Sequence, residues 1–178
     1  LTNERWLAVL DAAAALGRWT TRPSAGRARG IAIGKAFNSI VAEVVEISAT
    51  LTGIRVHAVA IVIDCYLSVN PGSVEAQLVG GMVHGLNAAL YGRQTFLGGA
   101  AQHKNFSTHR MIRASEMPAV KVQIMPNPAV ADRAMTIGGV GELGVPTLAP
   151  ALANAYYALT RKRVRTLPFF PSATMGGL

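Results

Sequence analysis

The sequence is poor in cysteine, in charge and in aromatic side chains. Cys65 is the one cysteine among 178 residues, so the chain cannot form an internal disulfide or build an all-cysteine zinc or iron–sulfur site by itself. Charged residues make up 15% and hydrophobic ones 51%, which excludes intrinsic disorder and predicts surfaces that partner protein covers. No uninterrupted apolar run reaches the roughly 18 residues that suggest a membrane span, and we expect no secretory signal at Leu1.

Acidic residues are scarce as well. The 9 Asp and Glu stand against 17 Lys and Arg, which leaves a net charge of +8 and raises the question of nucleic-acid binding. The basic residues are dispersed, however, with local groups within 18–29 and 161–165. The aromatic residues (6%) are not interleaved with them, as a base-stacking surface requires. We therefore expect no nucleic-acid partner, and instead a basic face turned toward an acidic subunit or toward further parts of a larger protein.

Local patterns predict one α+β domain over residues 1–178, with a helix and linker over 1–29 and a tail over 169–178. Asn3 and Gly17 are typical of the two ends of a helix, on which Trp6, Leu7, Leu10 and Ala14 recur at helical spacing. Asn70-Pro71 is a strong helix start. Helices and strands are mixed without strict alternation, which favours α+β. We expect helices over 3–16, 71–91 and 146–160, strands over 30–36, 39–48, 54–65 and 120–125, and loops over 94–118 and 126–133.

The densest glycine cluster surrounds a single carboxylate. Four glycines lie within residues 138–144, Glu142 stands among them, and an alanine-rich helical segment follows. Glycine permits close approach of a ligand to the main chain, and a helix start directs free N–H groups toward the preceding loop. The pattern alone leaves two interpretations open: a catalytic or ligand-binding acid, or an ordinary strand-to-helix turn.

Three blocks of the sequence carry a family resemblance. They are residues 139–144 with 149–155 and 161–168, residues 62–81, and residues 30–44. Together they resemble the C-terminal end of molybdopterin-binding large subunits of the xanthine oxidase/aldehyde oxidoreductase family. Within it, they are most similar to the bacterial branch of isoquinoline 1-oxidoreductase and membrane-associated aldehyde dehydrogenases. The resemblance runs in family order from Arg5 to Pro168.

This resemblance implies a fold, a cofactor and partners. The fold would be the C-terminal portion of the molybdenum cofactor-binding domain, a mixed sheet with packed helices. The activity would be that of a molybdenum hydroxylase that oxidises an aldehyde or N-heterocycle, with water as the oxygen source. The implied cofactor is molybdenum–molybdopterin, expected in its cytosine dinucleotide form and held chiefly through the pterin. Electrons would leave to an iron–sulfur subunit.

The family's upstream region is not part of this sequence. It supplies a glycine-rich cofactor loop and part of the substrate channel, so the remainder of the large subunit or another chain is expected as a partner. We expect the chain to be inactive alone.

The resemblance also assigns roles to single residues. Glu142 falls at the position of the family's active-site glutamate, a general base beside the molybdenum. A carboxylate is ionised at neutral pH and can take up a proton, although a loop-capping role remains the alternative. Leu143 departs from the proline common in the family. Gln77 matches a glutamine that hydrogen-bonds the pterin, where an amide offers donors and an acceptor; alternatively it is a solvated helix residue.

Further positions are assigned more loosely. Gly80, Gly81 and Gly141 would allow close approach of the cofactor, or merely close packing. Phe37 and Ser39 would lie at the substrate pocket, where an aromatic ring can stack on a planar substrate, although a core phenylalanine is as common.

The cysteine and the histidines do not indicate nucleophilic catalysis or metal binding by the protein. Cys65, at the end of an apolar run, reads as a small buried hydrophobe rather than a nucleophile. The four histidines show no metal-ligand spacing.

A rival hypothesis is a non-catalytic domain that keeps the fold without the activity and self-associates as a homo-oligomer. Molybdenum and pterin analysis of the purified protein would distinguish the two hypotheses.

Overall fold

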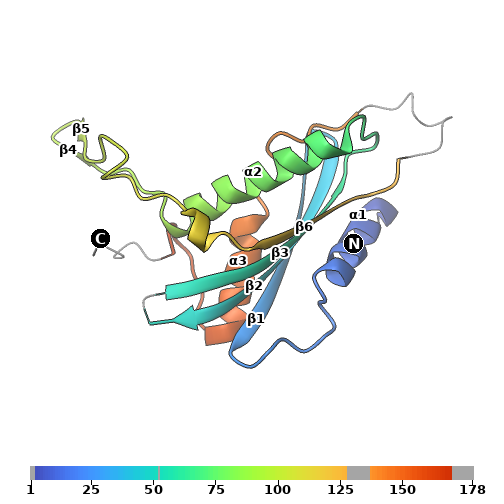
Figure 1. Ribbon diagram of the computed structural model, residues 1–178, viewed down its shortest axis with the longest axis horizontal. Helices are drawn as coiled ribbons and strands as arrows, with labels where there is room; N and C mark the ends of the chain where they lie inside the picture. The colour runs from blue at the N-terminus through green and yellow to red at the C-terminus, as the bar shows by residue number, and fades with distance from the viewer. Residues whose placement is uncertain (1–2, 52, 128–136, 170–178) are drawn as a thin grey trace.

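The computed structural model describes residues 3–51, 53–127 and 137–169. Within these ranges, three longer helices, a 3₁₀ turn and six strands follow one another (Figure 1). In order they are α1 (Glu4–Leu16), β1 (Arg27–Ala36), β2 (Ser39–Thr50), β3 (Gly53–Asp64), α2 (Pro71–Leu90), β4 (Phe96–Leu97), β5 (Ala100–Ala101), η1 (Ala114–Glu116), β6 (Ala119–Ile124) and α3 (Leu148–Thr160).

Four strands form a mixed sheet in the order β1-β2-β3-β6. β1, β2 and β3 pair antiparallel through two hairpins, whereas β6 returns parallel to β3 after the long α2 excursion. The helices α2 and α3 pack on one face and α1 packs on the other (Figure 1). This arrangement confirms the predicted α+β class with a mixed sheet and packed helices.

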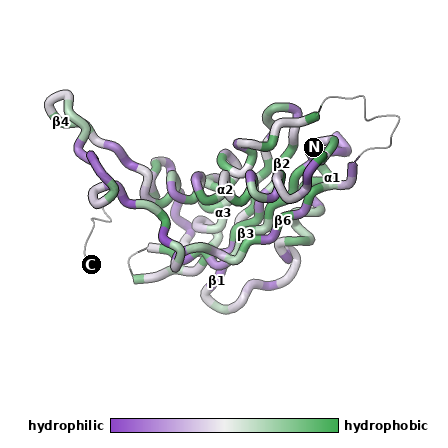
Figure 2. The backbone as a smooth tube through the Cα atoms, turned by 45° about the horizontal axis from the view of Figure 1, so that its top comes forward, coloured by the Kyte–Doolittle hydropathy of each residue, from purple (hydrophilic) through white to green (hydrophobic). Residues whose placement is uncertain are grey.

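Alternation along β2 divides the core into two layers. Val41, Val45 and Ile47 face the larger cluster under α2 and α3, while Ile40 and Val44 face the smaller cluster under α1. Both faces of β2 are covered, so the strand reads as a nearly continuous apolar run. Figure 2 shows hydrophobic residues gathered in the sheet and in α2.

The helix starts follow the predicted capping chemistry. The Asn3 side chain accepts from the backbone N–H groups of Arg5 and Trp6. Asn70 does the same for Ser73 at 3.0 Å, with Pro71 in the first turn of α2.

The predicted apolar face of the first helix was wrong in part. Leu7 is 39% exposed, whereas Val9 and Ala13 are fully buried against the sheet. α1 meets the sheet through Val9 and Ala13, with Trp6 and Leu16 partly buried beside them, so its buried face is not centred on Leu7.

Several element boundaries differ from the prediction. β1 begins at Arg27, three residues early, because Arg27 and Arg29 both pair with Glu46 across the hairpin at 2.7 Å. α3 begins at Leu148, two residues after the expected Pro146. The predicted loop over 94–118 contains the small β4–β5 hairpin and η1.

The predicted tail over 169–178 and the predicted loop over 126–133 lie partly outside the described residues. Among the residues that the structure does describe, no helix combines the length and apolar character needed to cross a bilayer.

Candidate functional site

Three segments that are distant in sequence meet at one end of the sheet. They are the β1–β2 turn at Phe37, the face of α2 from Gln77 to His84, and the glycine segment (residues 138–147) that leads into α3. Two backbone hydrogen bonds secure the start of the glycine segment. Gly138 N donates to Cys65 O at 3.0 Å, and Gly139 N donates to Phe37 O at 2.8 Å.

Glycines allow the glycine segment to lie directly against α2. A Cβ built on Gly144 would stand 2.3 Å from Leu78 O, and one on Gly85 would stand 2.8 Å from Val145 O. A Cβ on Gly81 would come within 3.2 Å of Gly144 Cα. Side chains at these positions would force the helix and the segment apart, which explains the glycines without reference to a ligand.

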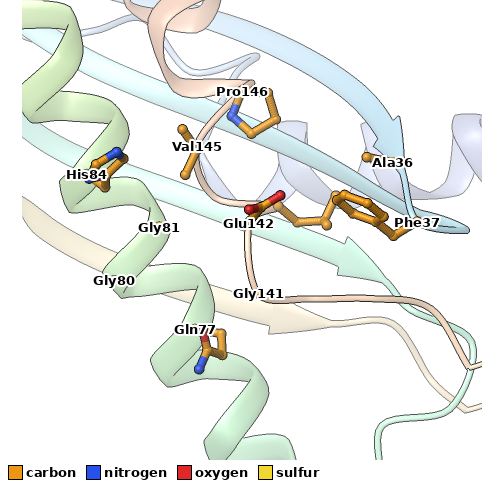
Figure 3. Close-up of a pocket in the computed structure, with 11 residues that line it drawn as sticks. Ala36, Phe37, Gln77, Gly80, Gly81, His84, Gly141, Glu142, Val145 and Pro146 are labelled. Atoms are coloured by element: carbon orange, nitrogen blue, oxygen red, sulfur yellow. The ribbon is translucent and has the colours of Figure 1, made fainter.

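The three segments enclose a cavity of about 560 Å³. Figure 3 shows Gln77 and His84 on the cavity side of α2, and Glu142 between α2 and Phe37. Among the described residues that line it, Glu142 is the only acid, and none is Lys or Arg. These residues are Ala36, Phe37, Gln77, Gly80, Gly81, His84, Gly141, Glu142, Leu143, Val145 and Pro146.

The structure brings together all the predicted site residues except Ser39. Ser39 lies one residue past the β1–β2 turn, fully buried, beneath Gly138, where an added Cβ would stand 2.1 Å from Ser39 Oγ. It supports the glycine segment from below and does not line the cavity. Ser39 is covered because the start of the glycine segment lies directly on it.

Phe37 is not a core residue. Its side chain is 63% exposed, and its φ of 49°, with 64° at Asn38, makes the turn a two-residue hairpin connection with both central residues left-handed. Such turns favour Asn and Gly, and a bulky residue there is strained. An exposed aromatic ring held in a strained turn at the rim of a cavity is typical of a functional position.

The two helix glycines serve different purposes. Gly81 is buried and meets Gly144, so it is a packing glycine that also reaches the cavity. Gly80 has nothing within 4 Å of where its Cβ would be, and it lines the cavity. A Cβ on Gly141 would likewise meet nothing closer than Gln77 Oε1 at 4.0 Å. The open backbone at Gly80 and Gly141 therefore leaves room for a ligand.

Sequence reasoning missed several lining residues, of which His84 is the most polar. It follows Gln77 by seven residues, two helical turns, so helical spacing places both on one face and could have found it. The others are apolar and carry no sequence signal: Ala36, Leu143, Val145 and Pro146.

Cys65 lies apart from the cavity lining and is 3% exposed. Burial raises the pKa of its thiol, and the neighbouring Asp64 carboxylate raises it further. A buried thiol with a raised pKa is a poor nucleophile, in agreement with the interpretation as a small hydrophobe. Within the described ranges no three His, Cys, Asp or Glu side chains cluster as metal ligands would.

Comparison with known proteins identifies the family. The family model described as "Molybdopterin cofactor-binding domain" matches residues 12–118, more than half of the chain. Isoquinoline 1-oxidoreductase subunit beta of Brevundimonas diminuta is 33% identical over 96% of this chain and 22% of its own length. Membrane-bound aldehyde dehydrogenase [pyrroloquinoline-quinone] of Gluconacetobacter polyoxogenes is 26% identical over 92% of this chain and 20% of its own length.

Solved structures agree at the level of the fold. Aldehyde oxidoreductase from Desulfovibrio desulfuricans superposes with a TM-score of 0.65 and 22% identity, over 75% of this chain and 15% of that one. Quinoline 2-oxidoreductase from Pseudomonas putida gives a TM-score of 0.61 with 21% identity, over 73% of this chain and 17% of that one. The chain belongs to the molybdopterin cofactor-binding domain family and is related to the molybdenum-binding subunits of the xanthine oxidase family. It spans about a fifth of the length of the curated relatives it matches.

The residues at the cavity fit a pterin-type cofactor. The Gln77 amide offers donors and an acceptor together, which suits the mixed polar edge of a pterin. Gly80 and Gly141 leave backbone accessible where a Cβ would otherwise protrude.

Proposed function

We propose that this chain forms the C-terminal part of the molybdenum-binding region of a molybdenum hydroxylase that oxidises an aldehyde or an N-heterocycle. One observation carries the proposal: the glycine segment presents Glu142 into a cavity that it shares with Gln77 and the open backbone of Gly80. The family membership and the names of the curated relatives support the reaction class.

Each residue has a role in this proposal. The Glu142 carboxylate accepts a proton, and the glycines around it leave the carboxylate open to the cavity. Gln77 binds the pterin, and Phe37 stacks on a planar substrate at the rim. The molybdenum–pterin group would supply the oxygen transfer and the two-electron redox chemistry when bound.

The finer assignments belong to the same proposal. The oxygen comes from water, the electrons pass to an iron–sulfur partner, and the cofactor has the cytosine dinucleotide form. The rest of the large subunit, on this chain's own continuation or on another chain, completes the cofactor cradle. The short span relative to the curated relatives supports this need for further protein.

The test is carried out in the assembled enzyme. Glu142→Gln preserves size and hydrogen bonding but cannot accept the proton. We expect molybdenum content to persist while turnover falls about 10²–10⁴-fold, the usual contribution of a general base. Gln77→Ala should instead lower molybdenum and pterin content. Glu75→Gln is the matched control, since Glu75 is an exposed acid on α2 outside the cavity lining.

Turnover of Glu142→Gln within about threefold of wild type, at full molybdenum occupancy, would exclude Glu142 as the base. The glycine segment would then have a structural role only. Absence of molybdenum and pterin from the purified wild-type assembly would instead favour the rival hypothesis of a non-catalytic domain.

A further inference from the structure

Glu43 is a carboxylic acid in the middle of the central strand, with no exposure to solvent. It lies on the face of β2 that α3 covers, between Val41 and Val45. Its neighbours in register are Ala32 on β1 and Ile61 on β3, and both are apolar. A carboxyl group in such surroundings is costly unless it meets a polar partner, so its presence calls for an explanation.

The polar group that faces it is the Thr147 hydroxyl. Thr147 is the N-cap residue of α3, but its side chain makes no capping hydrogen bond. It is 3% exposed. Neither the Glu43 oxygens nor Thr147 Oγ1 meets hydrogen-bond geometry with any described residue, although the two side chains are close enough to interact.

The charge state of Glu43 follows from its surroundings. Burial raises the pKa of Glu43 well above its usual range, and the Thr147 hydroxyl offsets only part of that effect. α3 carries no charged residue, and the titratable groups of the cavity, Glu142 and His84, add nothing to the shift. Burial therefore favours the protonated form of Glu43, which can donate a hydrogen bond to Thr147 Oγ1.

Thr147 is enclosed on its other side by β1. A Cβ on Gly34 would stand 3.1 Å from Thr147 Cγ2, and one on Gly30 would stand 2.0 Å from Ala151 O in the next turn of α3. The start of α3 thus rests on the backbone of β1 and on the side chain of Glu43 from β2.

The beginning of α3 determines where the glycine segment ends. Only residues 143–146 lie between Glu142 at the cavity and Thr147 at the start of α3. Within that stretch Val145 N donates to Glu142 O at 3.0 Å. The other end of the segment is already secured at Cys65 and Phe37. We propose that Glu43 is a positioning residue, which holds Thr147 through a buried polar contact and so fixes Glu142 at the cavity. The importance of that position for catalysis rests on the proposed function; the contact itself does not.

Hydrogen–deuterium exchange of the full chain tests the contact directly. Glu43→Gln keeps a donor and an acceptor, so peptides covering residues 138–147 should exchange within about twofold of wild type. Glu43→Leu leaves Thr147 without a partner and should speed exchange there by about tenfold or more, with peptides of α1 unchanged. Thr147→Val should match Glu43→Leu. Val45→Ala, on the same face of the same strand, is the control: it removes packing, and its effect should not concentrate in 138–147.

The pH dependence of the thermal midpoint gives a second readout. Because the pKa of Glu43 is raised on folding, the folded state holds a proton that the unfolded state has released. Stability should therefore fall as pH rises from about 4.3 toward the raised pKa. The thermal midpoint of Glu43→Gln should not show this fall with pH. Val45→Ala should show the same fall with pH as wild type, with a lower midpoint at every pH.

Equal exchange of 138–147 in Glu43→Leu and Glu43→Gln would overturn the proposal, as would an unchanged pH slope in Glu43→Gln. Should Glu43→Leu fail to fold, wild-type exchange in Thr147→Val overturns it equally. Neither readout requires molybdenum or turnover, so failure here is distinct from failure of the Glu142→Gln test.

Discussion

At the scale of single residues, glycine is required at this site for two different reasons, close packing and access to the cavity. Gly144 is glycine because α2 leaves no space for a Cβ, with Leu78 O at 2.3 Å from its ideal position. Gly80 has open space where its Cβ would be, inside a helix where glycine is unfavourable. Packing therefore explains the first glycine, whereas the second is better explained by the cavity that it faces.

The pair Gly80→Ala and Gly144→Ala separates the two constraints. Gly80→Ala should raise the free energy of unfolding by roughly 0.5–1 kcal/mol, the usual helix gain, while the new methyl group lowers molybdenum content of the assembled enzyme. Gly144→Ala should cost about 1–3 kcal/mol through overpacking. Denaturant titration and metal analysis measure the two effects. Unchanged molybdenum content in Gly80→Ala would remove Gly80 from the cofactor site.

At the scale of elements, α1 supports the site from the opposite face of the sheet. Arg5 Nε donates to Asp64 Oδ2 at 2.7 Å, and the guanidinium carbon lies 3.6 Å from the centre of the Tyr66 ring. Asp64 ends β3 and precedes Cys65, whose carbonyl accepts from Gly138. The docking of α1 is therefore linked through one short turn to the start of the glycine segment.

Asp64→Asn tests this link through its pH dependence. Burial alone would raise the pKa of Asp64, but hydrogen bonds from Arg5 and from Tyr66 N lower it below its usual range. The stabilisation by Asp64 is thus present above about pH 4 and is lost as pH falls through the lowered pKa. Asp64→Asn should have a lower thermal midpoint at pH 7, and the difference from wild type should shrink on acidification. Asp11→Asn, on the exposed side of α1, should leave the midpoint within error at both pH values.

At the scale of the whole molecule, apolar side chains remain exposed away from the cavity. Several of them lie on an arm (residues 93–111) that extends from the end of α2 and carries β4 and β5 (Figure 1). Phe96, Leu97 and Phe106 are 70%, 74% and 91% exposed. Exposed apolar side chains that lie together are typical of surfaces that contact other protein.

We expect this arm to drive self-association of the isolated chain. Leu97→Ser combined with Phe106→Ser should raise the dissociation constant measured by sedimentation by about tenfold or more, because each buried apolar side chain contributes about 1.5–3 kcal/mol. At concentrations where the wild type is monomeric the thermal midpoint should not change, since neither side chain packs in the core. Leu51→Ser, at a fully exposed lone leucine of the β2–β3 turn, is the control. Equal association of all three proteins would assign self-association to another surface.

Much of the molecule followed from local sequence. Asn70-Pro71 and the apolar spacing of Val74, Leu78 and Met82 set the start and the buried face of α2, because capping and helical period act over a few residues. The glycines around Glu142 marked a turn that exposes a carboxylate. The resemblance to the family placed Gln77 and Phe37 beside it, and the structure gathers all three around one cavity.

Tertiary contacts decided what local patterns could not. Whether a strand residue faces a cavity or the core depends on what covers that face, so Ser39 lies beneath Gly138 rather than in the cavity. The buried face of α1 is centred on Val9 and Ala13 because these residues meet the sheet, and the spacing of apolar residues in the helix does not encode that contact. Glu43 reads in sequence as an acid in an apolar strand, and only the tertiary structure brings the Thr147 hydroxyl near it. Sequence alone thus determined the elements and the chemistry they carry; the packing of those elements decided which groups meet, because burial and contact depend on residues far apart in the chain.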